Sequence, residues 1–414
     1  MSGLQPVRGT RDILPEESRR LRHIEDTARL VAGRFGYEEI ATPIFEFSEV
    51  FRRTLGDTSD IVTKEMYAFV DKGGDEVTLR PEGTAGVARM LISGGLIQDL
   101  PLKYFYHGPM FRYERPQKGR YRQFHQIGVE LLGVAEPIGD VEVIGLAAAV
   151  LEALGIGGRT TLELNTLGNA ASRAAYRERL VAYLRDHRAS LSEDSRTRLD
   201  RNPLRILDSK DRGDRAIIAG APDFGDSLDS ESREFFGAVL EGLEVLGIGY
   251  TLNSRLVRGL DYYCHTAFEF TTEALGAQGT VLAGGRYDGL VSQMGGTATP
   301  GVGWAAGMER LAMLAGDPGG TPRPVAIIPV GPEMEREAMA LAHILRRDGL
   351  TIELAYRGNM SRRMKRANRL NARAAIILGP DEAARGAATL RDFDSGTQEE
   401  VPLDSLSDHL GPYR

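Results

Sequence analysis

The sequence predicts an α+β core built on an antiparallel sheet, with a helical insertion, followed by a small α/β domain at the C-terminus. Residues 103–133 form two aromatic-rich runs around a polar turn, which is the pattern of a long antiparallel hairpin. Residues 169–247 are rich in Arg, Asp, Glu and Ala and have helical patterns, which predict an insertion of helices between two parts of one sheet. Beyond a Gly/Pro-rich linker at 314–324, the pattern alternates as βαβαβ. We therefore expect a core at 1–320, whose insertion spans about 169–247, and a separate domain at 325–414.

Composition excludes several classes of protein. The 414 residues carry a net charge of −7, which argues against a protein that coats nucleic acid indiscriminately but allows a local basic face. A single cysteine, Cys264, rules out an internal disulfide framework and fits a reducing cytosol. No apolar run of about 18 residues occurs, so we expect a cytoplasmic protein with no membrane partner. The His and Cys residues show no zinc spacing, so no metal site formed by the protein alone is expected.

The N-terminal part predicts a helix, a strand and a hairpin. Pro15 and the two acids after it favour a helix start, and apolar residues at helical spacing continue to Gly36. Residues 37–46 predict one strand that carries Pro43, and proline in a strand implies an edge or an interface. Residues 66–91 predict a hairpin, turned at two glycines, that is followed by a helix.

Glu82 and Thr84 lie where a predicted strand end meets a helix start, which is a common place for ligand groups. Glu82 could equally be an ordinary acid of a first helical turn.

The second strand of the long hairpin carries a polar face. Counting every second residue places Phe124, Gln126, Gly128 and Glu130 together, and Arg112 can join them from the first strand. Gln126 and Glu130 would lie roughly 13 Å apart along the strand, enough to line one elongated ligand. An aromatic, an amide, a glycine and a carboxylate on one face favour a pocket over a solvated surface.

Two later stretches carry charges in apolar surroundings. Arg258 and Asp261 stand where a buried strand would not tolerate an unpaired charge. Residues 301–314 predict a small-residue segment that leads into a helix, with Trp304 and Met308 on its apolar stripe and Arg310 off that stripe. An off-stripe arginine is usually a solvent-exposed residue.

The predicted C-terminal domain contains a basic run with no acidic residue. In an otherwise acidic chain this run favours contact with phosphate over a merely solvated helix face. Its members are Arg357, Arg362, Arg363, Lys365, Arg366, Arg369 and Arg373.

Several stretches resemble one enzyme family. Residues 111–126, FRYERPQKGRYRQFHQ, resemble motif 2 of the class II aminoacyl-tRNA synthetases in the form typical of histidyl-tRNA synthetases. TLRPEGT at 78–84, RLVRGLDYY at 255–263 and AGGRYDGLV at 283–291 are similar to the same family, and 37–46 and 301–314 correspond to motifs 1 and 3. The resemblance implies a class II antiparallel catalytic domain with a helical insertion, followed by an anticodon-binding domain of the class IIa type. It also implies ATP-dependent ligation of L-histidine to its tRNA through a histidyl-adenylate.

The resemblance assigns roles to particular residues. For ATP, which binds with Mg²⁺, Arg112 would grip the α-phosphate, Arg120 and Arg310 the γ-phosphate, and Phe124 would stack on adenine with Arg310 over the same base. These residue types suit the task because guanidinium binds phosphate oxygens in a bidentate way and an aromatic ring is a platform for a base. Arg258 would act with Arg112 as fixed positive charge beside the reacting phosphate. The implied histidine-binding residues are Glu82, Thr84, Gln126, Glu130, Tyr262 and Tyr263, with Glu130 and a tyrosine hydroxyl each addressing one imidazole nitrogen.

Partners follow from the same resemblance. Arg115 and Gln117, in the motif 2 loop, would face the acceptor end of the histidine tRNA, where they either recognise a base or only position phosphate. Arg362, Arg363 and Arg366 would bind tRNA from the second domain. The insertion would pack against the core, either touching the acceptor arm or forming a solvated layer. Motif 1 implies a homodimer with Pro43 near the subunit boundary.

Two alternatives remain at this stage. A non-catalytic regulatory relative, such as the histidine-sensing partner of a short ATP phosphoribosyltransferase, generally loses the ATP-gripping arginines, whereas Arg112, Arg120, Arg258 and Arg310 are all present. A class IIa synthetase for another amino acid fits less well with Glu130 and RLVRGLDYY. Pyrophosphate exchange with each candidate amino acid would distinguish a histidyl-tRNA synthetase from both alternatives.

Overall fold

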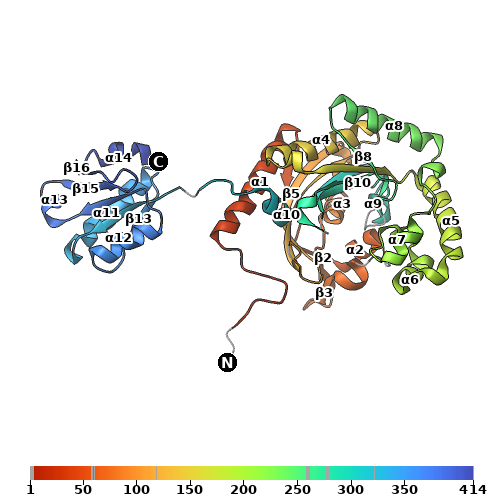
Figure 1. The fold of residues 1–414 in the computed structure, drawn as a ribbon, viewed down its shortest axis with the longest axis horizontal. Helices are drawn as coiled ribbons and strands as arrows, with labels where there is room; N and C mark the ends of the chain where they lie inside the picture. The colour runs from red at the N-terminus through yellow and green to blue at the C-terminus, as the bar shows by residue number, and fades with distance from the viewer. Residues whose placement is uncertain are drawn as a thin grey trace. The chain divides into compact units, whose positions relative to one another are not determined.

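The computed structural model describes residues 4–56, 59, 61–117, 119–257, 262–276, 279–320 and 322–413. The chain divides into two compact units, a first unit Met1–Pro318 and a second unit Gly319–Arg414, and Figure 1 labels their helices and strands. Among the described residues, none of the helices has both the length and the apolar character that a membrane span requires.

An eight-stranded sheet in the order β1-β5-β6-β11-β10-β9-β7-β8 forms the centre of the first unit. Only the outermost pairs, β1 with β5 and β7 with β8, are parallel. This antiparallel sheet confirms the predicted fold class, and β5 and β6 pair from Leu102↔Leu132 to Phe111↔Gln123 as the expected long hairpin. Its strands are β1 (Glu38–Ile40), β5 (Leu102–Phe111), β6 (Gln123–Leu132), β7 (Thr161–Thr166), β8 (Thr251–Leu252), β9 (Cys264–Thr271), β10 (Thr280–Arg286) and β11 (Gly301–Gly307).

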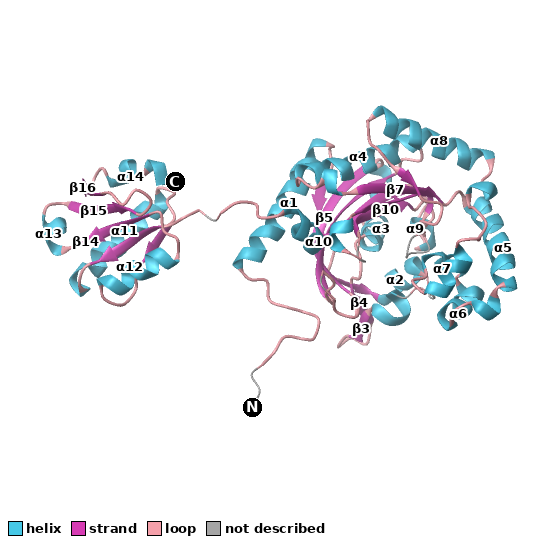
Figure 2. Ribbon diagram, in the orientation of Figure 1, coloured by secondary structure: helices cyan, strands magenta, loops and turns pink. Residues whose placement is uncertain are grey.

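Helices cover both faces of this sheet (Figure 2). One apolar core lies between the sheet and α1 (Pro15–Arg34), α4 (Pro137–Ala153), α8 (Ser230–Val245) and α10 (Met308–Ala315). The other core involves α2 (Ser48–Leu55), α3 (Thr84–Ser93), α9 (Leu290–Gln293) and the insertion helices. Helix α1 begins at Pro15 and buries the expected stripe of Leu21, Ile24, Ala28 and Val31.

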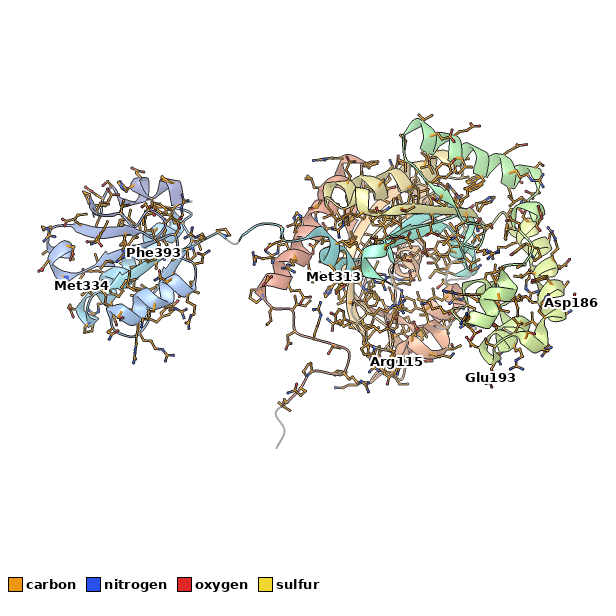
Figure 3. All side chains as sticks on the ribbon, viewed as in Figure 1. Arg115, Asp186, Glu193, Met313, Met334 and Phe393 are labelled. Carbon is orange, nitrogen blue, oxygen red and sulfur yellow. The ribbon has the colours of Figure 1, made fainter. Side chains whose placement is uncertain are left out.

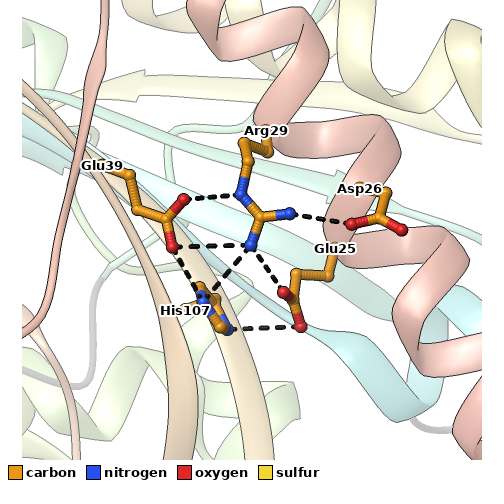
Figure 4. Close-up of polar contacts among 5 residues, drawn as sticks. All are labelled: Glu25, Asp26, Arg29, Glu39 and His107. Atoms are coloured by element: carbon orange, nitrogen blue, oxygen red, sulfur yellow. Dashed lines mark hydrogen bonds and ion pairs between the residues drawn. The ribbon is translucent and has the colours of Figure 1, made fainter.

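A charged cluster attaches α1 to the sheet edge (Figure 4). Arg29 contacts Glu39 of β1 at 2.5 Å and Glu25 at 2.6 Å, and it also pairs with Asp26. His107 of β5 contacts Glu39 at 3.0 Å and Glu25 at 3.3 Å. The hydrogen bonds that Arg29 donates to Glu39, and then those to Glu25, raise its pKa. The cluster fixes the helix against the edge strand, although pairs this exposed contribute only about 1 kcal/mol each.

The segment 37–46 differs from its prediction. Instead of one strand, it forms β1 and then β2 (Phe45–Phe47), which pairs with β4 (Glu76–Leu79) in a separate three-stranded sheet, completed by β3 (Tyr67–Val70). Pro43 lies between the two strands, where its missing N–H interrupts no ladder. The hairpin β3–β4 was predicted and is present.

Trp304 also differs from its prediction. It lies in β11, not on the helix that follows, because the small residues 301–307 pair with β6 and β10 as a central strand. Its indole N–H donates to the Val143 carbonyl at 3.1 Å.

The predicted insertion contains α5 (Ala170–Asp186), α6 (Glu193–Arg201), the 3₁₀ segment η5 (Pro203–Asp208) and α7 (Arg212–Ile218). Figure 3 draws Asp186 and Glu193 of these helices at the opposite side of the first unit from Met313 of α10. Buried Asp214 organises them by accepting hydrogen bonds from the hydroxyls of Ser192, Ser195 and Ser209. Helix α8 instead packs on α4 in the core of the first unit.

The second unit has a five-stranded sheet in the order β13-β12-β14-β15-β16. The βαβαβ pattern is present as β12 (Val325–Pro329), α11 (Glu335–Arg347), β13 (Ile352–Leu354), α12 (Met360–Arg369) and β14 (Ala374–Leu378), with all three strands parallel. The antiparallel strands β15 (Ala387–Asp392) and β16 (Gln398–Pro402), which were not predicted, extend it, together with α13 (Pro380–Ala384) and α14 (Leu406–His409).

Candidate functional site

A cavity of about 630 Å³ opens over the middle strands of the large sheet. Residues of β6, β9, β10 and β11 line it, together with the end of β5, the start of α3 and the start of α10. The cavity therefore brings together residues that lie more than two hundred positions apart in the chain. Of the residues expected from the sequence, the lining contains Glu82, Thr84, Arg112, Arg120, Phe124, Gln126, Tyr262, Tyr263 and Arg310.

Three guanidinium groups gather at one part of the cavity. Arg112 follows β5, Arg120 closes the motif 2 turn, and Arg310 projects from α10, where it donates to the Thr280 carbonyl at 2.6 Å. Glu114 lies 3.2 Å from Arg120 and 3.9 Å from Arg112. Burial, and then the neighbouring charge of Arg120, lower the pKa of Arg310. An anion in this region would relieve the repulsion among the three cations.

Phe124 and Arg310 are held in place by a residue pair that the sequence analysis missed. The Glu309 carboxylate accepts from the backbone N–H of His125 at 3.0 Å and contacts its Nδ1 at 2.9 Å. Because His125 follows Phe124 and Glu309 precedes Arg310, the pair ties β6 to α10 beside the cavity. The only signal in the sequence was the position of Glu309 next to the motif 3 arginine.

The polar groups at another part of the cavity are acceptors. Glu82 accepts from the backbone N–H groups of Thr84 at 2.6 Å and Ala85 at 2.9 Å, so its carboxylate also caps the start of α3. Burial raises the pKa of Glu82. The Oε1 atom of Gln126 is buried and has no hydrogen-bond partner in the part of the chain that the structure describes. Such an acceptor suits a ligand donor such as an ammonium group.

Glu130 differs from the expectation that it lines the pocket with Gln126. It lies behind Thr84, whose hydroxyl donates to its Oε1 at 2.7 Å, and the hydroxyls of Tyr106 and Tyr287 complete its bonds. The side chain is 1% exposed, and burial raises its pKa to about 8. The strand periodicity was correct, but two tyrosines that the sequence analysis did not single out supply partners inside the protein.

Two glycines make room for one of these tyrosines. A Cβ at Gly83 would lie 2.3 Å from the Tyr106 ring, and a Cβ at Gly128 would lie 2.4 Å from it. Only glycine allows this close approach on both sides of the ring. The ring can then deliver its hydroxyl to Glu130.

The stretch 283–291 contains residues that stabilise the fold as well as a residue that lines the cavity. Arg286 is fully buried and forms an ion pair with Asp140 of α4, and it also donates to the Val134 carbonyl at 2.9 Å. Tyr287, the next residue, is the one that reaches Glu130.

The remaining predicted residues are not among the described residues that line this cavity. Arg258 and Asp261 are outside the described residues. Arg115 and Gln117 are exposed in the turn between β5 and β6, where Gln117 pairs with Arg120 as an isolated bridge. Among the described residues, no group of three or more His, Cys, Asp or Glu side chains is arranged to hold a metal ion.

The basic helix α12 corrects one expected tRNA contact. Arg363 is only 6% exposed, and it donates to the Pro329 carbonyl at 2.6 Å and to Glu335 at 2.8 Å. It is a buried link between α12, β12 and α11, which does not fit a phosphate contact. Arg362 and Arg366 are exposed, and Arg366 pairs with Glu353 at 2.7 Å.

Comparison with known proteins agrees with this arrangement. Residues 9–311 match the family model described as histidyl-tRNA synthetase, and residues 324–411 match the anticodon binding domain. The histidine–tRNA ligase of Rhodospirillum rubrum is 64% identical over 414 residues, covering 100% of both chains, and that of Gluconacetobacter diazotrophicus is 56% identical, covering 99% of each. The crystal structure of apo S. aureus histidyl-tRNA synthetase is similar with a TM-score of 0.82 at 34% identity, covering 98% of this chain and 99% of that one. The chain therefore belongs to the histidyl-tRNA synthetase family, whose enzymes charge tRNA with histidine.

Proposed function

We propose that the cavity binds ATP and L-histidine side by side and joins them as histidyl-adenylate, before the histidyl group passes to the 3′-terminal adenosine of the histidine tRNA. This proposal rests on the distribution of charge in one cavity, which has positive groups at one part and acceptor groups at another. Arg112, Arg120 and Arg310 supply positive charge for phosphates, while Glu82 and Gln126 supply acceptors for an α-ammonium. A phosphate compound and an amino acid fit these two regions together.

The first reaction needs positioning and charge. A carboxylate oxygen of histidine attacks the α-phosphorus of ATP, a new C–O–P link forms, and the bond to pyrophosphate breaks with its electron pair leaving on pyrophosphate. No protein nucleophile takes part. Arg112, with Arg258 as its predicted partner, neutralises the developing charge, and fixed positive charge of this kind commonly contributes about 3 to 4 kcal/mol. Phe124 is the platform for adenine, and Arg310 covers it.

Mg²⁺ that arrives with ATP would add positive charge at the phosphates. Glu114 suits it, because its Oε2 atom is buried and makes no hydrogen bond to any described residue, only an ion contact with Arg120. Glu114 is therefore the residue that would hold this ion.

Histidine is selected by the buried groups behind the ammonium site. Tyr262 and Tyr263 line the cavity, and Thr84 joins it to Glu130. We retain Glu130 in the histidine-binding set because it holds the Thr84 hydroxyl from behind. Hydrogen-bonding groups buried in this way reject ligands that leave them unpaired.

The exposed face of the three-stranded sheet supports the homodimer. Phe45, Phe47 and Phe69 are 58%, 59% and 49% exposed, and they share one face because Phe47 and Phe69 both pair with Val77. An aromatic face of this kind beside Pro43 suits a second copy of the chain. Phe47→Glu is expected to shift the protein from dimer to monomer in analytical ultracentrifugation.

We propose that transfer RNA is bound at two places. Arg362 on the second unit is exposed and available for phosphate, and exposed Arg366 would exchange its pairing with Glu353 for a phosphate contact. Arg115 and Gln117 of the first unit would face the acceptor end. Such a protein works in the cytoplasm, where its tRNA substrate is used.

Histidine-dependent exchange of pyrophosphate into ATP, measured without tRNA, tests the proposed reaction. The wild-type protein should catalyse exchange with histidine and not with other amino acids, and Arg112→Ala should lower the rate by some hundreds-fold. A protein that binds histidine but catalyses no exchange would instead fit the regulatory alternative.

A further inference from the structure

A second cavity in the first unit is lined by four arginines. It has a volume of about 340 Å³ and lies between α5 and η5. Arg173 and Arg177 come from α5, one helical turn apart, Arg201 ends α6, and Arg205 belongs to η5. No carboxylate occurs among the described residues that line it.

Some of the arginines of this cavity bind other groups of the protein, and two of them do not bind any described residue. Arg173 donates to the Tyr263 carbonyl. The exposed side chains of Arg177 and Arg201 make no hydrogen bond or ion pair with another described residue. Because Arg177 and Arg201 have no carboxylate partner among the described residues, their positive charges favour an anion with several charges in the cavity.

The second cavity adjoins the first one. Arg205, Val257 and Tyr263 line both of them. An anion in the second cavity would therefore lie beside whatever occupies the histidine end of the main cavity. Tyr263 adds an aromatic ring at the boundary, and bases stack on such rings without sequence preference.

The size of the cavity selects among anions. The volume of about 340 Å³ holds a few phosphate groups but is much smaller than one turn of a duplex. A nucleic acid duplex cannot enter it, whereas a single strand can place one or two phosphates there. The part of a tRNA that must reach the main cavity is its single-stranded 3′ end.

We infer that the cavity of Arg173, Arg177, Arg201 and Arg205 binds backbone phosphates of the single-stranded 3′ end of the tRNA and positions the terminal adenosine for transfer. The inference rests on the proposed function, because only that reaction brings a tRNA 3′ end to this place. Pyrophosphate, the product of the first step, shares the same phosphate chemistry and is the competing ligand.

The test removes the two arginines that make no hydrogen bond or ion pair with another described residue and do not line the main cavity. Arg177→Ala/Arg201→Ala should raise the Kd for the full tRNA about threefold to tenfold, because two exposed charge contacts are lost. The slope of log binding constant against log salt should fall by about 1.4, the value for two contacts on a single strand. The Kd for the same tRNA trimmed of its 3′-terminal nucleotides should not change. Arg177→Lys/Arg201→Lys should restore most of the salt dependence.

Arg185→Ala/Arg196→Ala is the matched control. It removes one exposed arginine from α5 and one from α6, outside the cavity, and should leave both Kd values unchanged. If the cavity variant loses affinity equally for full and trimmed tRNA, or for neither, the inference is wrong. A raised KM for pyrophosphate in tRNA-free exchange, with normal tRNA binding, would assign the cavity to pyrophosphate instead. Absence of histidine-dependent exchange in the wild-type protein would overturn the proposed function, which is a distinct result.

Discussion

The carboxyl group of Glu130 should make the stability of the first unit depend on pH in a predictable direction. Burial raises its pKa from an ordinary 4.5 to about 8. Because the pKa is higher in the folded state than in the unfolded state, the contribution of the protonated group is full below pH 4.5 and is lost as pH rises through about 8. The shift corresponds to about 5 kcal/mol, since each pKa unit is about 1.4 kcal/mol.

Glu130→Gln removes this titration and keeps the size of the side chain. The free energy of unfolding of the wild type should therefore fall relative to that of the variant as pH rises from 5 to 8, by up to about 1.4 kcal/mol per pH unit. The amide also changes the hydrogen bonds with Thr84, Tyr106 and Tyr287, but that cost is a constant offset. The slope with pH, and not the offset, is the informative quantity.

Urea denaturation followed by tryptophan fluorescence measures this slope. Trp304 is the only tryptophan in the sequence, is 2% exposed, and pairs with Val129 next to Glu130. Its emission therefore reports the first unit and not the second. A difference between variant and wild type that is the same at pH 5 and pH 8 would refute the reasoning, because it would mean that Glu130 titrates as an ordinary carboxyl.

Three further changes test the packing and the site. Arg286→Met should lower the free energy of unfolding by about 3 to 5 kcal/mol because it leaves Asp140 buried without its partner. The double variant Arg286→Met/Asp140→Leu should recover most of this loss. A single variant as stable as the wild type in the Trp304 assay would contradict this expectation. Gly128→Ala should cost about 1 to 3 kcal/mol because its Cβ meets both the Tyr106 ring and the Trp304 carbonyl oxygen, so an added Tyr106→Leu should relieve only part of the clash. No change in the urea midpoint of the single variant would mean that the ring and the strand move freely. Glu309→Ala should raise the KM for ATP about tenfold or more, because losing the contact with His125 lets Phe124 and Arg310 move. The KM for histidine should stay within about twofold. Equal changes in both KM values would show a general loss of folding.

Much of the fold followed from local patterns. The apolar stripe of α1 and the alternation along β6 are periodicities within one element, so they could be recognised without knowing what the element packs against. The linker near 318 and the βαβαβ pattern depend on turn residues and apolar runs in the same way. The prediction of one strand at 37–46 was wrong because the two halves of this segment pair with different sheets. Local propensity does not indicate which sheet a strand will join.

The residues of the candidate site also fall into two groups, those identified from local patterns and those whose importance comes from distant contacts. Arg112, Phe124 and Gln126 were identified from spacing and resemblance, and they line one cavity. Glu309 was missed because its importance comes from a contact with His125, which lies 184 residues away.

The sequence by itself determined which elements form and which residue types stand near the reacting groups, because periodicity and motif wording are properties of neighbouring residues. Only the tertiary structure decided which charges are available to a ligand. Arg363 of α12 looked like its exposed neighbours but is buried, with bonds to β12 and α11, and Arg286 is neutralised by Asp140, 146 positions earlier in the chain. The charged state and exposure of a side chain depend on partners and burial, and the fold supplies both from distant parts of the sequence.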